Sequence, residues 1–271
     1  GGAPGRGGGG GGAGPPPPRG TAAGSEGSAR RAARRAFRRD QGDEADVTDQ
    51  AIDFRIEVGQ WVKGRLLRNP AAMKIPTNDL DIFVVRNFLT PEECAGLIEL
   101  IDAERIPSQL LSPTEDPEFR TSESCNVDPE HPLVRQVEEK ITDLIGIDPA
   151  HGETIQGQRY AVGQRFKPHH DFFYTNEPYW PAMEESGGQR TWTAMAFLNQ
   201  PEGGGQTAFD KAGLRIAPRA GNLIAWNNLD AKGEPNPYSL HQGCPVTAGV
   251  KYVITKWYRE RPWIPSDVPT Y

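Results

Sequence analysis

At residues 158–173 the chain reads Gln-Arg-Tyr-Ala-Val-Gly-Gln-Arg-Phe-Lys-Pro-His-His-Asp-Phe-Phe, two strand-like runs separated by a glycine turn. The same texture continues beyond Glu153, where short β-rich runs alternate with Gly, Pro and Asn. Eight strands are predicted: Thr154–Val162, Arg165–Phe173, Thr191–Leu198, Gln206–Phe209, Leu214–Ala217, Asn222–Trp226, Ser239–Cys244 and Lys251–Tyr258. Eight short strands with turn signals between them indicate a double-sheet jelly roll or a barrel.

Two helices are predicted before this β-rich half. Thr90-Pro-Glu-Glu93 is a capping box followed by apolar residues at helical spacing, which predicts a helix over 91–105. A second apolar stripe runs from Leu133 to Ile145 and stops near Gly146. The expected fold class is α+β, with a double-stranded β-helix (jelly roll) core buttressed by N-terminal helices.

Composition divides the chain into four parts. Residues 1–50 are rich in Gly, Pro and Arg and are expected to be disordered, because they contain too little apolar surface to offset the entropy of ordering. Residues 51–80 are expected to be a linker and the start of the globular region. Residues 80–262 are expected to be the main folded domain, and 263–271 a C-terminal tail.

Charge is distributed unevenly along the chain. Residues 1–40 have a net charge of +6 and the remainder −12, against −6 for the whole. The basic segment is either a contact for nucleic acid or an acidic surface, or a solvated tail. Nucleic acid as the substrate is disfavoured, because the predicted folded part lacks the basic surface that phosphates require.

No apolar run approaches the roughly 18 residues that a membrane span needs. Three cysteines without a CxxC pair do not form a disulfide framework, and the N-terminus lacks the basic-then-apolar order of a signal peptide. A cytoplasmic location is the default expectation, and the oligomeric state stays open.

A candidate metal site combines residues from two predicted strands. His169 and Asp171 are two residues apart, so on a strand they project to the same face, while His170 points away. If His241 approaches from a facing strand, the set is two imidazoles and one carboxylate, the facial triad of non-haem Fe(II) oxygenases. The spacing alone is weak evidence, since His169 could also be an ordinary hydrogen-bonded surface residue.

Lys251 opens the last predicted strand among apolar neighbours. A buried lysine there requires an anionic partner, and the far carboxylate of a metal-bound dicarboxylate would supply one. The alternative is an edge lysine that reaches solvent.

Four ordered motifs resemble those of prolyl 4-hydroxylases: residues 158–173, Gly188–Asn199, Gly203–Phe209, and Ser239–Val246 followed by Lys251. The resemblance covers about residues 80–262, including Arg120-Thr-Ser122, and is to the stand-alone, collagen-type catalytic domain. It implies a 2-oxoglutarate- and Fe(II)-dependent dioxygenase that uses O2, forms 4-hydroxyproline in a peptide or protein, and is sustained by ascorbate.

The resemblance also implies residue roles. The iron ligands would be His169, Asp171 and His241, and Lys251 would pair with the distal carboxylate of 2-oxoglutarate. The cosubstrate pocket would include Tyr160, Thr207 and Trp257, where Tyr160 and Trp257 could instead be core aromatics. Arg190 matches a position associated with the peptide-binding groove, although it could be a surface ion-pair member. Independently of the resemblance, Tyr179 and Trp180 could stack on a proline-rich peptide or could merely anchor their loop.

Three alternatives remain at this stage. The first is a same-superfamily oxygenase that hydroxylates another side chain or a small molecule. The second is a repair oxygenase that acts on nucleic acid. The third, from another class, is a metal-binding jelly-roll module without turnover.

Overall fold

The computed structural model describes residues 1–2, 44–112 and 114–265. The predictions of a disordered N-terminal tail and of a C-terminal tail therefore lie largely outside the described residues. One compact unit begins at Ala45. None of the helices within the described ranges is long and apolar enough to cross a membrane.

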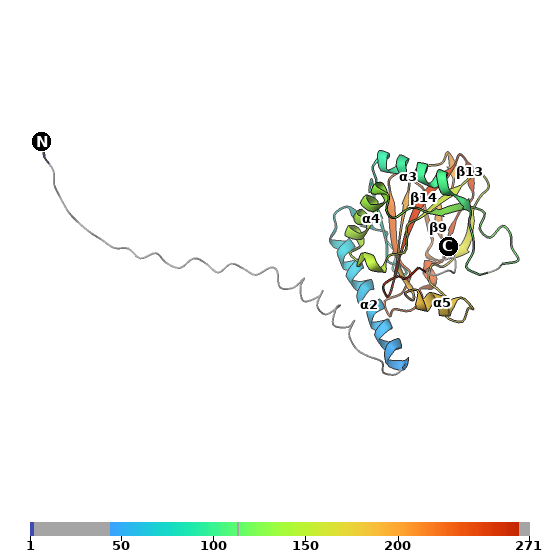
Figure 1. Cartoon of the computed structure of the whole chain (residues 1–271), viewed down its shortest axis with the longest axis horizontal. Coiled ribbons are helices and arrows are strands. Elements are labelled where there is room, and N and C mark those ends of the chain that lie inside the picture. The colour runs from blue at the N-terminus through green and yellow to red at the C-terminus, as the bar shows by residue number, and fades with distance from the viewer. Residues whose placement is uncertain (3–43, 113, 266–271) are drawn as a thin grey trace. The chain divides into compact units, whose positions relative to one another are not determined.

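The core consists of β-sheets with antiparallel pairing (Figure 1). The major sheet has eight strands in the order β1 (Ala72–Lys74), β2 (Ile82–Val85), β11 (Leu223–Asn227), β7 (Arg190–Phe197), β14 (Lys251–Arg259), β5 (Gln156–Tyr160), β4 (Glu123–Asn126) and β3 (Ile106–Pro107). The minor sheet has the order β10 (Leu214–Ile216), β9 (Thr207–Phe209), β12 (His241–Gly243) and β6 (Phe166–His169). A third sheet pairs β13 (Val246–Ala248) with β8 (Gly203–Gly204).

Both predicted helices are present, as α3 (Pro91–Glu104) and α4 (Pro132–Ile145). The capping box of α3 forms as expected: Thr90 Oγ1 accepts a hydrogen bond from the Glu93 backbone, and the Glu93 carboxylate accepts one from the Thr90 backbone. Helix α4 ends at Gly146, whose φ of 79° is the left-handed conformation that glycine adopts readily. The shorter elements are α5 (Trp180–Glu185) and the 3-10 helices Pro149–His151, Asp210–Ala212 and Pro237–Ser239.

A third long helix, which was not predicted, occupies much of residues 51–80, the segment expected to be a linker and the start of the globular region. Helix α2 spans Glu44–Arg68, and it buries Val58, Val62 and Leu66 in the same apolar cluster as α3 and α4. The helix also begins inside the segment that was expected to be disordered. Its end is tied to α4 because the Arg65 guanidinium donates to the carbonyls of Asp143 and Leu144.

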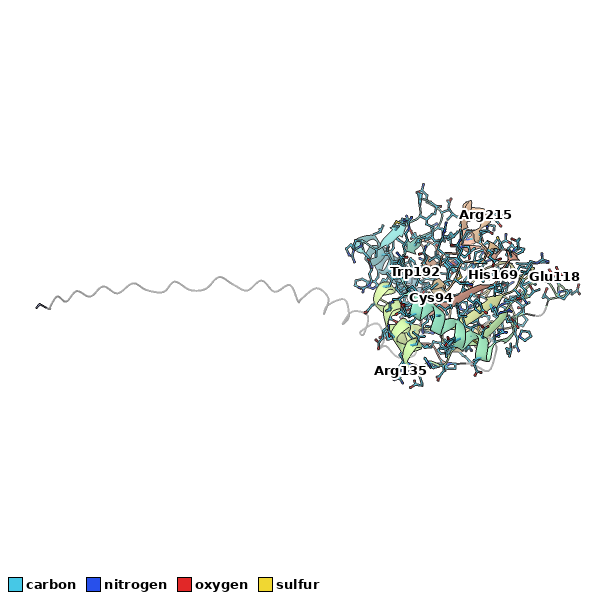
Figure 2. The ribbon with its side chains drawn as sticks, turned by 90° about the horizontal axis from the view of Figure 1, so that it is seen from above. Cys94, Glu118, Arg135, His169, Trp192 and Arg215 are labelled. Atoms are coloured by element: carbon cyan, nitrogen blue, oxygen red, sulfur yellow. The ribbon has the colours of Figure 1, made fainter. Side chains whose placement is uncertain are left out.

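The major sheet separates two apolar layers. On β7, Trp192, Ala194 and Ala196 pack in the cluster shared with the helices, while Met195 and Phe197 pack in the cluster shared with the minor sheet. This alternation is the period-2 pattern of a strand covered on both faces. In Figure 2 Trp192, which is fully buried, is seen within the folded part, whereas the exposed Arg135 and Arg215 are at its periphery.

The predicted fold class is confirmed: a helix-buttressed jelly roll of the α+β class, in which all eight predicted strands exist. Two differences matter. The predicted strand Arg165–Phe173 ends at His169, so Asp171 lies beyond it. Strands β1 to β4, which add both edges to the major sheet, were not predicted. They are two to four residues long, so each is too short for alternation to be visible in the sequence.

Leu66 and Leu67 provide a test of whether α2 belongs to the core. Leu66 is fully buried and its neighbour Leu67 is 56% exposed. We expect Leu66→Ala to lower the free energy of unfolding by about 2–5 kcal/mol, through lost apolar burial and the cavity left behind. Leu67→Ala should change it by less than about 0.5 kcal/mol. Urea unfolding of both variants measures this, and equal, small effects would contradict the assignment of α2 to the core.

Candidate metal centre and active site

Two histidines face each other across neighbouring strands of the minor sheet. His169 is the last residue of β6 and His241 the first of β12, and the antiparallel register pairs the two directly. Their rings lie 4.3 Å apart between centroids. His241 therefore comes from the adjacent hydrogen-bonded strand rather than from a strand of the facing sheet.

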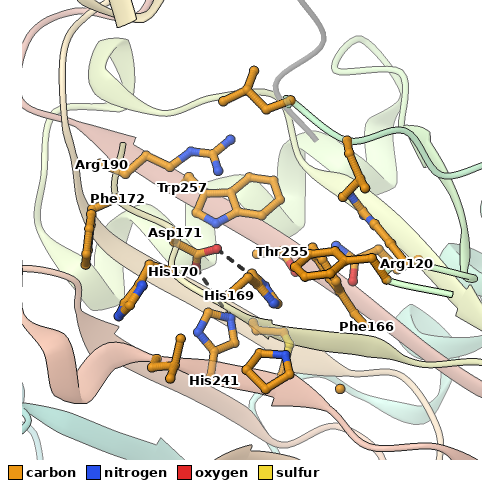
Figure 3. Close-up of a pocket in the computed structure, with 18 of the residues that line it drawn as sticks. Arg120, Phe166, His169, His170, Asp171, Phe172, Arg190, His241, Thr255 and Trp257 are labelled. Carbon is orange, nitrogen blue, oxygen red and sulfur yellow. Dashed lines mark ion pairs between the residues drawn. The ribbon is translucent and has the colours of Figure 1, made fainter. Parts of the chain in front are cut away.

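Asp171 completes the predicted triad. The chain bends after β6, and the carboxylate turns toward both imidazoles: His169 Nε2 lies 4.0 Å from Oδ1 and His241 Nε2 lies 3.9 Å from Oδ2 (Figure 3). One potential ligand atom from each of the three residues lies within 4.8 Å of the others. The structure thus brings the three residues together as predicted, although a bend and not strand alternation directs Asp171.

The hydrogen bonds of the two imidazoles determine which nitrogen is free. His169 Nδ1 lies 2.8 Å from the Lys167 carbonyl oxygen, and His241 Nδ1 lies 2.9 Å from that of Ser239. A carbonyl oxygen only accepts, so each Nδ1 carries the proton and each Nε2 presents its lone pair to the centre of the triad. Burial, followed by the proximity of His241, holds the pKa of His169 well below its usual value, which keeps this ring neutral.

The carboxylate is kept ionised despite its burial. Burial acts to raise the pKa of Asp171, but the neighbouring His241, His169 and Arg190 and a hydrogen bond from Thr193 outweigh it, so the pKa is lowered. Two imidazoles and one carboxylate form a donor set that suits Fe(II), and they leave the remaining positions open.

The triad lines a cavity of about 510 Å³ that also contains the residues predicted to hold the cosubstrate. Lys251, Tyr160, Thr207 and Trp257 all belong to its wall, together with Arg190 and Tyr179. Trp180 does not line it and instead begins α5. Sequence reasoning did not single out the cavity residues Phe119, Tyr174 and Thr255, because nothing local distinguishes them from ordinary packing residues.

Lys251 is buried, and none of the described residues gives it an anionic partner. Its side chain is 2% exposed, and its Nζ lies over the rings of Tyr160 and Phe197, at 5.1 and 5.6 Å from their centroids. Within the described part of the chain no carboxylate lies at ion-pair distance from it. Burial lowers the pKa of Lys251 to about 8. Thr207 Oγ1 is likewise buried without a hydrogen-bond partner within that part, so the cavity presents a donor and a cation suited to an added carboxylate.

Comparison with known proteins agrees with this geometry. A profile of the 2OG-Fe(II) oxygenase superfamily matches residues 155–259. Probable prolyl 4-hydroxylase 8 of Arabidopsis thaliana is 32% identical over 200 residues, which cover 65% of this chain and 67% of that protein. A putative prolyl 4-hydroxylase of Acanthamoeba polyphaga mimivirus is 30% identical, covering 66% and 74%. The chain belongs to the prolyl 4-hydroxylase family.

A solved structure supports the same assignment. The viral collagen prolyl hydroxylase of Paramecium bursaria chlorella virus-1, in its 2OG complex, superposes with a TM-score of 0.53 at 26% identity and covers 66% of this chain and 95% of that one. This prolyl 4-hydroxylase is therefore a 2-oxoglutarate-dependent dioxygenase, with Fe(II), 2-oxoglutarate and O2 as its cofactor and cosubstrates, as the sequence predicted, and ascorbate is typical of such enzymes.

Arg190 of the prolyl 4-hydroxylase is buried in an ion pair rather than lying on the surface. Its Nε and Nη2 donate to the two oxygens of Glu153, at 2.6 and 2.7 Å, and its guanidinium lies 4.1 Å from the centroid of the Trp257 ring. Arg259 donates to the same carboxylate. Glu153, which sequence reasoning missed, thus fixes the arginine that covers Trp257 at the cavity wall.

Removal of a triad histidine provides a test of the metal centre. We expect His241→Ala to weaken Co(II) binding by more than the roughly 10- to 100-fold that loss of an outer partner costs, since it deletes a ligand. His170→Ala is the matched control: His170 Nδ1 hydrogen-bonds with the Tyr174 hydroxyl at 2.8 Å, and His170 is not part of the triad. Anaerobic titration monitored by visible absorption measures both. Equal losses would contradict the triad.

Proposed function

We propose that this prolyl 4-hydroxylase hydroxylates prolyl residues of a peptide or protein at the His169–Asp171–His241 centre, forming 4-hydroxyproline. The observation that carries the proposal is the placement of buried Lys251, which pairs with no carboxylate of the described residues, in the same cavity as this triad. A metal-binding module would need the triad alone. The lysine adds a site for an anion that is bound at the same time as the metal.

His169 and His241 would hold Fe(II) through Nε2, and Asp171 would hold it through its carboxylate. Bound iron supplies the activation of O2 and the oxidative decarboxylation of 2-oxoglutarate. The protein keeps both rings in the tautomer that can bind metal, through the Lys167 and Ser239 carbonyls. Because the strands that carry the two histidines belong to one hydrogen-bonded sheet, strand pairing positions both imidazoles.

Lys251, Thr207 and Tyr160 would receive the distal carboxylate of 2-oxoglutarate. A carboxylate at Nζ compensates the desolvation of the ammonium, and Thr207 Oγ1 provides a donor that has no partner among the described residues. Tyr160 would contribute its ring, which lies against the Lys251 ammonium. Its hydroxyl donates a hydrogen bond of 3.0 Å to Gln158 Oε1.

The substrate peptide would lie at the aromatic part of the cavity wall. Tyr174 and Tyr179 are joined there, because the Tyr174 backbone donates to the Tyr179 hydroxyl at 3.1 Å, and Tyr174 is 46% exposed. Aromatic walls bind the preformed polyproline II conformation at low entropic cost. Arg190 would contribute by fixing Trp257 rather than by a free charge, and Trp180 would anchor the loop.

The location of the enzyme stays a prediction. Cys94, Cys125 and Cys244 are buried and unpaired, which suits the reducing cytoplasm that the sequence favours.

The direct test of the proposed function combines two readouts. Enzyme loaded with Fe(II) is exposed to O2, 2-oxoglutarate and ascorbate with a panel of proline-containing peptides, and succinate and peptide mass are measured together. Succinate together with one added oxygen on proline, located at C4 by amino-acid analysis, is expected. Succinate without peptide oxidation would retain the oxygenase and overturn the prolyl substrate. No succinate with any peptide would favour the non-catalytic module.

The pKa of Lys251 predicts the pH dependence of cosubstrate binding. Below pH 8 the lysine is already protonated, and affinity should be flat. Above about pH 8 the ligand-free lysine is neutral, so binding of the dicarboxylate must take up a proton, and affinity should fall by about tenfold per pH unit. Calorimetry of the metal-loaded, anaerobic enzyme in buffers of different ionisation enthalpy measures both effects.

Lys251→Met is the control for this pH dependence. It removes the ammonium and keeps the length of the side chain, so 2-oxoglutarate binding should weaken by about 2 kcal/mol or more, roughly 30-fold. The fall above pH 8 should disappear in this variant, and Co(II) affinity should stay near that of the unaltered enzyme. An unchanged pH profile in Lys251→Met would show that another group titrates.

A further inference from the structure

A hydroxyl group on the major sheet reaches across to the carboxylate of the triad. Thr193 Oγ1 donates a hydrogen bond of 2.7 Å to Asp171 Oδ2, and the two residues are 0% and 5% exposed. Thr193 belongs to β7, whereas Asp171 follows β6 of the minor sheet. This contact therefore links the two sheets at the metal centre.

The direction of the hydrogen bonds extends the contact by one residue. A carboxylate only accepts, so the single proton of the Thr193 hydroxyl is committed to Asp171, and its oxygen can only accept from elsewhere. Asn228 Nδ2 fills that role at 2.9 Å. The requirement for a donor defines the orientation of the Asn228 amide, and Asn228 is itself fully buried.

The backbone of Asn228 continues the same chain to the second histidine. Its N–H donates to the Thr191 carbonyl, and its carbonyl accepts from the Asn236 N–H at 3.0 Å. The Asn236 carbonyl in turn accepts from the backbone and the hydroxyl of Ser239. The Ser239 carbonyl then accepts from His241 Nδ1. Asp171 and His241 are thus oriented by the two ends of one hydrogen-bonded chain.

We propose that Thr193 and Asn228 are positioning residues of the metal centre: Thr193 holds Asp171 by Oδ2 so that the carboxylate binds metal through one oxygen, and Asn228 sets the Thr193 hydroxyl. The inference rests on the proposed function, since it assigns these residues to the same centre. Hydrogen bonds from outer residues to a ligating carboxylate fix its orientation and tune its affinity. Use of one oxygen preserves the open positions that the cosubstrate and O2 require.

The experiment uses Co(II) alone as a probe of the full chain under anaerobic conditions, with visible absorption as the readout. Thr193→Val keeps the shape of the side chain and removes the hydroxyl. We expect it to weaken Co(II) binding by about 10- to 100-fold and to alter the absorption spectrum, because the carboxylate is free to bind through both oxygens. Thr193→Ser restores the hydroxyl and should recover both the affinity and the spectrum.

Thr191→Val is a matched control. Thr191 lies on the same strand, is also fully buried, and donates its hydroxyl to the Tyr258 carbonyl at 3.1 Å, away from the triad. It loses one buried hydrogen bond, so it reports any general cost to the fold, and its Co(II) spectrum should be unchanged. Asn228→Ala should shift affinity and spectrum in the same direction as Thr193→Val, but less.

The outcomes distinguish a failure of the proposed function from a failure of the positioning role of Thr193. If the unaltered chain does not bind Co(II), the proposed function fails. If it binds and Thr193→Val behaves like Thr191→Val, the role of Thr193 is overturned. If Thr193→Val does not fold, Asn228→Ala decides, because an unchanged spectrum in that variant would contradict the coupling between the amide and the carboxylate.

Discussion

The antiparallel pairing of β6 with β12 is the interaction on which the rest of the site depends. It places His169 opposite His241, so the two imidazoles meet at one edge of the minor sheet. A slip of one residue would send one ring to the opposite face. The pairing is held on the other side of β12, where Gln242 and Gly243 pair with β9, the strand that begins with Thr207. The two histidines and Thr207 are thus parts of one hydrogen-bonded sheet, whereas Lys251 and Tyr160 belong to the major sheet.

A buried cluster of compensated charges lies at the wall of the cavity. Glu153 is buried between Arg190 and Arg259, and none of the three residues is more than 5% exposed. Removal of one member would leave an uncompensated charge in a medium of low dielectric constant, which is strongly unfavourable. Arg190 is therefore held over the Trp257 ring by its pairing with Glu153.

Sequence reasoning succeeded where the signal was local and failed where it was not. The capping box at Thr90 predicts α3 because both of its hydrogen bonds close within four residues. Phe54, Val58, Val62 and Leu66 repeat every four residues, yet burial of that stripe depends on α4 and the sheet. The segment was therefore interpreted as a linker and the start of the globular region, and the helix was not predicted. The spacing of His169 and Asp171 pointed to the metal centre, although a bend produces their proximity.

The Thr193–Asn228 contact could not be predicted from the sequence either, because it joins segments that are distant along the chain. The two residues are 35 positions apart, and both look like ordinary members of buried segments. Alternation predicts that Thr193 faces inward with Met195 and Phe197, but not what its hydroxyl meets. That partner is supplied by a different sheet, so it follows only from the packing of the two sheets against each other.

Two buried lysines on β14 differ in whether a carboxylate of the described residues compensates their charge. Lys251 and Lys256 are both about 98% or more buried, and strand alternation sends them to opposite faces of the major sheet. Lys256 faces the helices and pairs there with Glu138 of α4, so its charge is compensated within the fold. Lys251 faces the cavity, where aromatic rings and no described carboxylate surround its ammonium. In the proposed function, the charge of Lys251, which no described carboxylate compensates, is left for an added anion beside the His169–Asp171–His241 triad, and 2-oxoglutarate is the dicarboxylate that the family uses.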